Sequence, residues 1–94
     1  MARHTTISVG NSWTELTAND VTELTFMVKS GSPIYVAATV GQNAPTDTLT
    51  SLEYQRHQGE LLTTLAKMAP GLAGANRIYA KAVGDVAQVF VSHA

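Results

Sequence analysis

One segment, VTELTFMVKSGSPIYVAATV at residues 21–40, limits the possible folds more than any other part of the chain. Apolar and polar residues alternate on both sides of a central SGSP sequence, and this period of two is typical of strands that bury one face. The segment predicts a β-hairpin, in which Gly31 permits the turn and Pro33 begins the second strand because it lacks an amide hydrogen. The core residues predicted in this segment are Leu24, Phe26, Val28, Ile34, Val36, Ala38 and Val40, and Ile78 is added from a later strand.

The rest of the chain shows the same short pattern, interrupted by turn-forming residues. The last two extended segments predict a second hairpin around residues 83–85, and residues 65–69 predict a single helical turn before a Pro-Gly stop. We therefore expect an all-β fold, a small antiparallel β-sandwich or jelly-roll-like barrel with one short helical turn. A small open sheet with one packed helix is the alternative. Residues 1–6 are polar and aperiodic, so we expect a flexible N-terminal arm followed by a single β-domain at residues 7–94.

Charge is scarce in this chain. Only 14% of the 94 residues are charged and the formal net charge is −1, so the basic field that favours nucleic-acid binding is absent. The chain contains no cysteine, which excludes disulfides and thiolate metal sites. No segment approaches the roughly twenty apolar residues of a membrane-spanning helix, and no apolar run follows residues 1–6 as in a signal peptide. We therefore expect synthesis in the cytoplasm, with neither nucleic acid nor a membrane as partner.

The residues that could perform chemistry are dispersed. The three histidines, His4, His57 and His93, lack the spacing of a zinc site, and we expect all three to be solvated. The seven carboxylates show no spacing that predicts an acid–base pair. The sequence also lacks a nucleophile elbow and a phosphate-binding glycine loop. We therefore expect no enzymatic activity, no metal and no cofactor.

Some strands are apolar on both faces. A sandwich strand normally shows a polar face to water, so a second apolar face predicts a cover, either a loop of the same chain or a neighbouring subunit. Aromatic side chains are enriched in interfaces, which makes Tyr35, Tyr79 and Phe90 candidate contacts in a homo-oligomer. Trp13, Tyr35 and Tyr79 are each candidates for the core, for an interface or for a ligand platform such as one that stacks on a sugar.

We also expect the N-terminal arm to order on binding, by adding a strand to the exposed sheet edge of a neighbour. Backbone hydrogen bonds would supply the affinity of such a contact, while alternate side chains fill pockets on the partner. The alternate apolar residues for these pockets are Ile7 and Val9, which directly follow residues 1–6. The complete set of candidate interface residues is Ile7, Val9, Trp13, Tyr35, Tyr79 and Phe90.

The order of segments SWTELTANDVTELTFMVKSGSPIYVAATVGQNAPT, GELLTTLAKMAPG and ANRIYAKAVGDVAQVFVSHA resembles that of small tailed-phage virion proteins, particularly head-decoration (cement) proteins. This resemblance implies a non-enzymatic protein, made in the host cytoplasm and located on the capsid surface of the virion. It also implies the major capsid protein as partner and a homotrimeric state. The chain has no long insertion for host binding, so a stabilising role is preferred. A tail or baseplate accessory that binds host-surface carbohydrate is the alternative.

Overall fold

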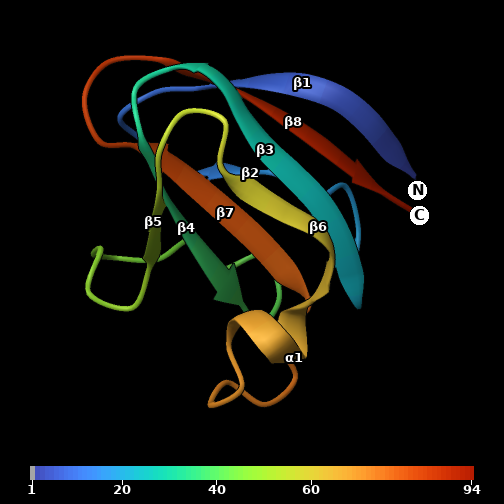
Figure 1. Ribbon diagram of the computed structural model, residues 1–94. Coiled ribbons are helices and arrows are strands. Elements are labelled where there is room, and N and C mark those ends of the chain that lie inside the picture. Colours follow the sequence, from blue (N-terminus) through green and yellow to red (C-terminus); the bar gives the residue numbers. More distant parts are fainter. Residues whose placement is uncertain (1) are drawn as a thin grey trace.

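The computed structural model describes residues 2–94 as eight β-strands and one short helix (Figure 1). In chain order the elements are β1 (Arg3–Val9), β2 (Thr14–Glu15), β3 (Glu23–Gly31), β4 (Ile34–Thr39), β5 (Leu52–Tyr54), β6 (Gly59–Thr64), α1 (Leu65–Met68), β7 (Arg77–Ala82) and β8 (Ala87–His93). The helical turn predicted at residues 65–69 is present as α1. Its first turn is capped by the Thr64 hydroxyl, which accepts a hydrogen bond from the Lys67 N–H at 3.1 Å.

The strands form two four-stranded antiparallel sheets that pack face to face. Sheet A has the order β1-β8-β3-β6, and sheet B has the order β2-β7-β4-β5. Successive strands mostly alternate between the two sheets, and these two orders are the connectivity of an eight-stranded jelly roll. The predicted all-β antiparallel sandwich is confirmed, and the alternative of one open sheet with a packed helix is wrong.

Neither predicted hairpin exists, because β3 and β4 belong to different sheets, as do β7 and β8. The two turns cross between the sheets side by side. The Ser32 N–H donates to the Val86 carbonyl at 3.2 Å, and the Val83 N–H donates to the Pro33 carbonyl at 2.9 Å. Gly31, at φ +88°, passes so close to the Val86 backbone that a side chain would collide with it. The two turns therefore hold each other and form a corner of the sandwich.

Most of the predicted core is confirmed. The predicted residues that are at most 1% exposed are Leu24, Phe26, Val28, Ile34, Val36 and Ile78. Ala38 is partly buried and packs against them. The prediction that Val40 is a core residue is wrong. Val40 is 47% exposed, because β4 ends one residue earlier and the chain turns away at Gly41, where φ is +71°.

The expected flexible arm is also wrong for the described residues. Arg3–Val9 forms β1, which pairs with β8 along its whole length; Met1 lies outside the described residues. Most side chains of β1 are exposed, and its apolar alternation is limited to Ile7 and Val9, so no apolar pattern marks the first part of this edge strand in the sequence. Val9 is fully buried and Ile7 packs against the core of its own domain. β1 is therefore already part of a sheet and does not extend outward as an arm.

Candidate functional site

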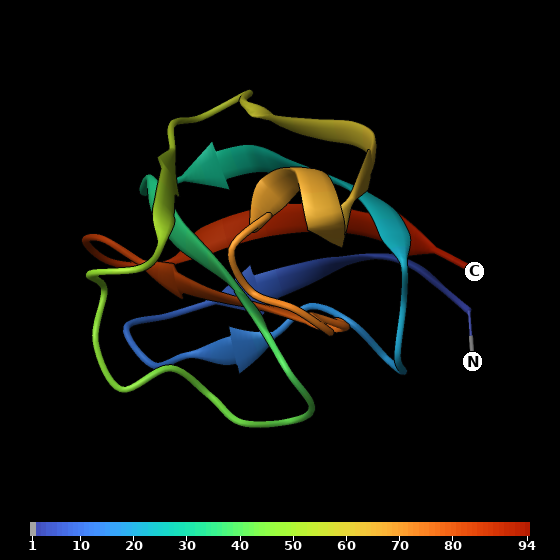
Figure 2. The same cartoon turned by 90° about the horizontal axis from the view of Figure 1, so that it is seen from below.

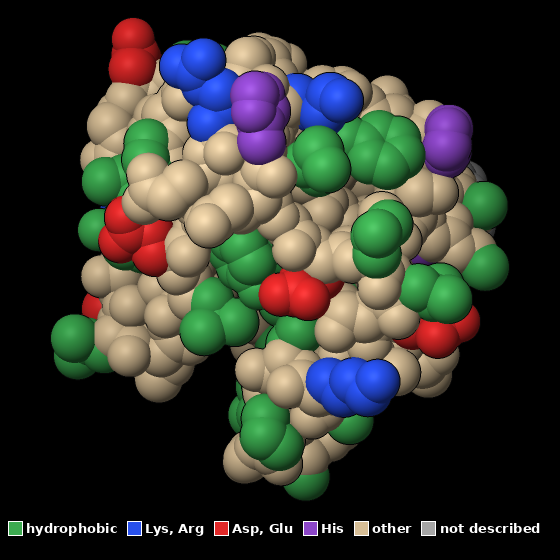
Figure 3. Space-filling view, viewed as in Figure 1, with side chains coloured by type: hydrophobic (Ala, Val, Ile, Leu, Met, Phe, Trp, Pro, Cys, Tyr) green, Lys and Arg blue, Asp and Glu red, His purple; other side chains and the backbone are tan. Residues whose placement is uncertain are grey.

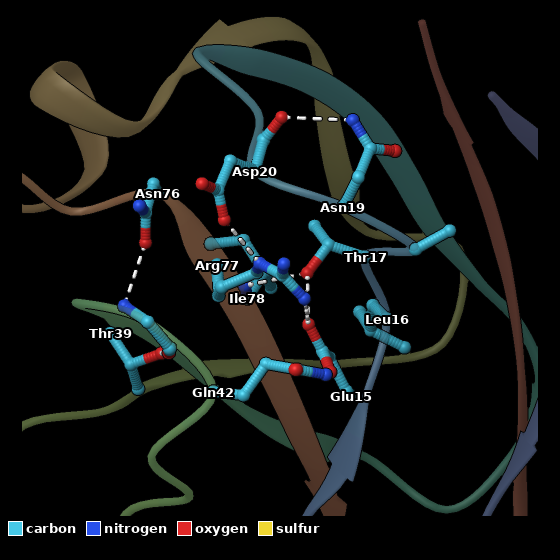
Figure 4. Close-up of polar contacts among 12 residues, drawn as sticks. Glu15, Leu16, Thr17, Asn19, Asp20, Thr39, Gln42, Asn76, Arg77 and Ile78 are labelled. Atoms are coloured by element: carbon cyan, nitrogen blue, oxygen red, sulfur yellow. Dashed lines mark hydrogen bonds and ion pairs between the residues drawn. The ribbon is translucent and has the colours of Figure 1, made fainter. Parts of the chain in front are cut away.

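The main ion-pair cluster lies on the outer face of sheet B, around Arg77 at the start of β7 (Figure 4). The guanidinium donates to the Glu15 carboxylate at 2.7 Å and to the Asp20 carboxylate at 2.8 Å. Glu15 also accepts hydrogen bonds from the Thr17 hydroxyl at 2.9 Å and from the Gln42 amide at 2.8 Å. The cluster therefore joins β2, the β2–β3 connection, β7 and the β4–β5 connection.

These bonds occupy the carboxylate that would be the best candidate for a catalytic group. Burial raises the pKa of Glu15, but the hydrogen bonds from Gln42, Arg77 and Thr17 outweigh burial and lower the pKa below its ordinary value. Hydrogen bonds to Glu15 and Asp20 raise the pKa of Arg77. A general base at neutral pH needs an accessible lone pair and a raised pKa. The cluster is instead suited to holding the surrounding connections in place.

The three histidines have separate surroundings. The expectation of a solvated His93 is wrong, because this residue is 7% exposed and its Nε2 accepts a hydrogen bond from the Ala18 N–H at 3.0 Å. His4 packs edge-on against the Phe90 ring, with 5.2 Å between ring centres. His57 lies in the β5–β6 turn at φ +70°. Within residues 2–94, no three His, Cys, Asp or Glu side chains are grouped so that they could hold a metal ion.

Three of the candidate interface residues, Trp13, Tyr35 and Tyr79, lie on the outer face of sheet B. Tyr79 is only 7% exposed although it is outside the core cluster, and burial raises its pKa. The Lys81 Nζ lies 6.0 Å from the centre of the Trp13 ring. Tyr35 is half-buried and lies opposite Lys81 and Glu53 in the neighbouring strands. Each ring is at least partly covered by its own chain.

Much of the cover on this face comes from the same chain. The β4–β5 connection, residues 40–51, folds back along sheet B towards the edge strand β2 (Figure 2). The Gln42 amide reaches Glu15, and the Asn76 side chain accepts a hydrogen bond from the Gly41 N–H at 2.7 Å. The sequence predicted that either a loop of the same chain or a neighbouring subunit would cover the second apolar face. On sheet B, a loop of the same chain supplies this cover. Phe90 lies on sheet A, so the structure does not bring the six candidate residues together.

The outer face of sheet A carries a groove of about 460 Å³ between β3 and β6, which we call the sheet-face groove. Met27 and Phe90 are paired in register on adjacent strands and form part of its floor. Leu61, which is 85% exposed, lines one side, and Lys29 and His57 lie at one end. In Figure 3, basic, histidine and apolar side chains adjoin along the upper rim of the molecule.

A second groove, of about 380 Å³, lies between α1 and the strands β4 and β5, and we call it the helix groove. Figure 3 shows the molecule hollowed between two lobes at its lower edge. The lining includes Val36 and Met68 together with Leu52 and Leu72, which are 46% and 40% exposed. Among the described residues, no titratable side chain lines this groove. Its chemistry is suited to burying apolar side chains of a partner.

Sequence reasoning missed the exposed leucines of β6. Leu61 and Leu62 are consecutive, 85% and 67% exposed, and Leu62 has φ +49°. The register with β3 shifts between Leu24 and Phe26, and the Leu62 N–H donates to the Thr25 hydroxyl at 2.8 Å, which indicates a β-bulge. Two adjacent leucines interrupt the expected alternation of an extended segment, and this interruption is the signal available in the sequence.

The fold and these surfaces define residues 2–94 as a jelly-roll β-sandwich with an apolar groove beside α1 and a groove on sheet A that has an apolar floor and a basic end. Comparison of the chain with protein-family models, with curated proteins and with solved structures finds no match. Across residues 2–94, no helix has the length and apolar character needed to cross a membrane.

Proposed function

We propose that this protein is a non-enzymatic structural protein of a tailed-phage virion, which binds the outside of the assembled head and stabilises it. Its partner is the major capsid protein, and it acts on the capsid surface as a homotrimer. Jelly-roll domains occur in viral capsid proteins as well as in lectins and cupins, so the fold is compatible with this role without deciding it. The resemblance of the sequence to head-decoration proteins supports the choice of partner.

The helix groove is the observation that carries the proposal. It is open and apolar, and it contains exposed leucines on a chain in which only 14% of residues are charged. Exposed apolar side chains that line an open recess provide a place where another protein can bury apolar side chains of its own. The Arg77 cluster supports a non-enzymatic role, because its carboxylates, Glu15 and Asp20, are bonded to Arg77 of the same chain. Many copies that bridge adjacent capsid subunits would add their effects through multivalency, so one modest contact per copy is sufficient.

The test measures co-sedimentation of the purified protein with heads that were assembled without it. Leu72→Asp places a charge in the helix groove, and we expect it to weaken head binding at least about tenfold, which corresponds to about 1.4 kcal/mol. Val83→Asp is the matched control, because Val83 is also 40% exposed but lies in the β7–β8 turn. Circular dichroism of both variants checks that the sandwich is retained.

Three results would contradict the proposal. Wild-type protein that stays in the supernatant does not bind heads, and equal losses for the two variants would exclude the helix groove as the contact. A cryo-electron-microscopy map with density for this chain at the tail tip would exclude the head location. Specific binding to a host polysaccharide on a glycan array would favour the alternative, a carbohydrate-binding accessory of the tail or baseplate.

A further inference from the structure

The tip of the β4–β5 connection presents an apolar side chain beside an acidic one. Leu49 is 88% exposed, more than any other large apolar residue within the described part of the chain. The Asp47 carboxylate accepts a hydrogen bond from the Leu49 N–H at 2.9 Å. The Thr48 carbonyl accepts hydrogen bonds from the Ser51 hydroxyl at 2.7 Å and from the Ser51 N–H at 3.3 Å. These bonds hold the tip in a turn, so Leu49 is displayed without support from any surface of its own domain.

The sheet-face groove has the complementary chemistry. Its apolar floor contains Met27, which is 36% exposed, and Phe90. The β5–β6 turn is attached to β3 by two backbone hydrogen bonds, from the His57 N–H to the Val28 carbonyl at 2.7 Å and from the Val28 N–H to the Gln58 carbonyl at 2.9 Å. This attachment brings His57 to the end of the groove that Lys29 lines, and the exposed turn residue Arg56 directly precedes His57.

The charges at this end of the groove have no internal partner. Within residues 2–94, both ion pairs are made by Arg77, so neither Lys29 nor Arg56 is neutralised by a carboxylate of its own chain. Glu60 is the carboxylate that lines the groove, and it accepts a hydrogen bond from the Tyr54 hydroxyl at 3.1 Å. The groove therefore favours an apolar side chain that is accompanied by a free carboxylate.

We propose that the β4–β5 tip of one copy of this chain docks in the sheet-face groove of a second copy. Leu49 then packs on Met27 and Phe90, and the Asp47 carboxylate lies opposite Lys29 and Arg56. The groove volume of about 460 Å³ is larger than a leucine side chain, so the tip enters without displacing the sheet. This contact supplies the oligomer of the proposed function, but it forms between copies and is measured without heads.

The positions of the tip and the groove determine the kind of assembly. Figure 1 shows the β4–β5 connection at the lower left of the molecule and the β5–β6 turn, whose residues His57 and Gln58 line the groove, in its upper part. The contact therefore joins two different surfaces, and each copy has one free tip and one free groove. A head-to-tail contact of this kind forms a ring if its rotation closes and an open filament if it does not. A trimer is the ring that the resemblance to head-decoration proteins implies.

Disulfide trapping tests the contact directly, because the natural chain contains no cysteine. Leu49→Cys protein is mixed with Met27→Cys protein that carries a mass tag, and the rate of forming the mixed disulfide is measured under mild oxidation. Val86→Cys replaces Met27→Cys in the control, since Val86 is 45% exposed but lies outside the groove. We expect the Leu49–Met27 pair to form at least about tenfold faster than the control pair. Equal rates would overturn the proposal.

Charge reversal provides the second measurement, by light scattering of the cysteine-free protein over a range of concentrations. Asp47→Lys or Lys29→Glu alone should weaken association at least about tenfold, and the two changes in one chain should restore it in part. Wild-type protein that stays monomeric at the highest concentration, or single variants that associate like wild type, would overturn the contact. Head binding by a protein that fails these tests would leave the proposed function intact and remove only this inference.

Discussion

Replacing Phe26 tests whether the two sheets are held together as described. The residue is 1% exposed on β3 of sheet A, and its ring packs edge-on against Tyr54 on β5 of sheet B, with 5.0 Å between ring centres. Removal of a buried phenylalanine ring costs about 3–5 kcal/mol, of which the aromatic pair contributes about 0.5–1.5 kcal/mol. A domain of 94 residues has a total stability of about 5–14 kcal/mol. Phe26→Ala should therefore retain only a small margin of stability.

The chain provides its own control, because it contains only two phenylalanines. Phe90 lies on the neighbouring strand β8 with its ring on the outer face, half-buried. Phe90→Ala removes the same atoms from a site that still touches water, so we expect a loss of about 1 kcal/mol. Phe26→Leu keeps most of the volume and should cost about 1–2 kcal/mol, mainly through the lost contact with Tyr54.

Urea unfolding at 25 °C measures these differences, with the single tryptophan, Trp13, as fluorescent probe and circular dichroism as a second probe. The order of stability should be wild type, Phe90→Ala, Phe26→Leu and Phe26→Ala. A loss for Phe26→Ala no larger than that for Phe90→Ala would refute the assignment of Phe26 to the space between the sheets. Protein concentrations are kept low, so that association through the sheet-face groove does not contribute.

Three further predictions concern the charged cluster, a close backbone approach and a strained leucine. The folded-state pKa of Glu15 is lowered, so the ionised Glu15 side chain stabilises the fold. This stabilisation is present above the unfolded-state pKa near 4.5 and is lost as the pH falls through the folded-state pKa. Glu15→Gln should therefore flatten the curve of unfolding free energy against pH in that range. Gly59→Ala should lower the free energy of unfolding in urea by about 1–3 kcal/mol or more, because the new Cβ would lie 2.7 Å from the Met27 Cα. Gly10→Ala is the control, because no atom lies within 4 Å of the new Cβ, and its stability should stay within about 0.5 kcal/mol of wild type. Leu62→Gly should relieve the φ of +49° and raise stability by about 1 kcal/mol, whereas Leu61→Gly should lower it by about 0.5–1 kcal/mol; the reverse order would contradict the strain.

Alternation along the chain predicted which side chains face the core, but not which strands pair. Leu24, Phe26 and Val28 share one face in any strand that contains them, because the side-chain period is two. The partner of that strand depends on the corner where Ser32 bonds to Val86, and these residues are far apart in the sequence. A short turn with glycine and proline is compatible with a hairpin and with a crossing between sheets. The sequence therefore predicted the sandwich correctly and both hairpins wrongly.

The candidate site was harder to predict, because it depends on what covers each face. Tyr79 has the chemistry of an interface residue, yet it is only 7% exposed, and the connection that carries Gln42 folds back to bond Glu15, the residue opposite Tyr79 in β2. The residues that remain exposed are aliphatic, such as Leu49 and Leu61, and single exposed leucines are common in proteins. Their significance appears only when the grooves are known, since a protruding side chain and a recess are complementary only in three dimensions.

Backbone strain in sheet A is concentrated at β6, the edge strand beside the sheet-face groove. Within residues 2–94, the non-glycine residues with positive φ are His57, just before β6, and Leu62, inside β6. β6 is an edge strand, and bulges on edge strands hinder the addition of a further strand. The positive φ angles of His57 and Leu62 each lower the stability of the folded chain by about 1–3 kcal/mol. His57 lines the sheet-face groove, and Leu62 follows Leu61, which lines it as well, so the bulge that hinders strand addition at the β6 edge lies beside the groove.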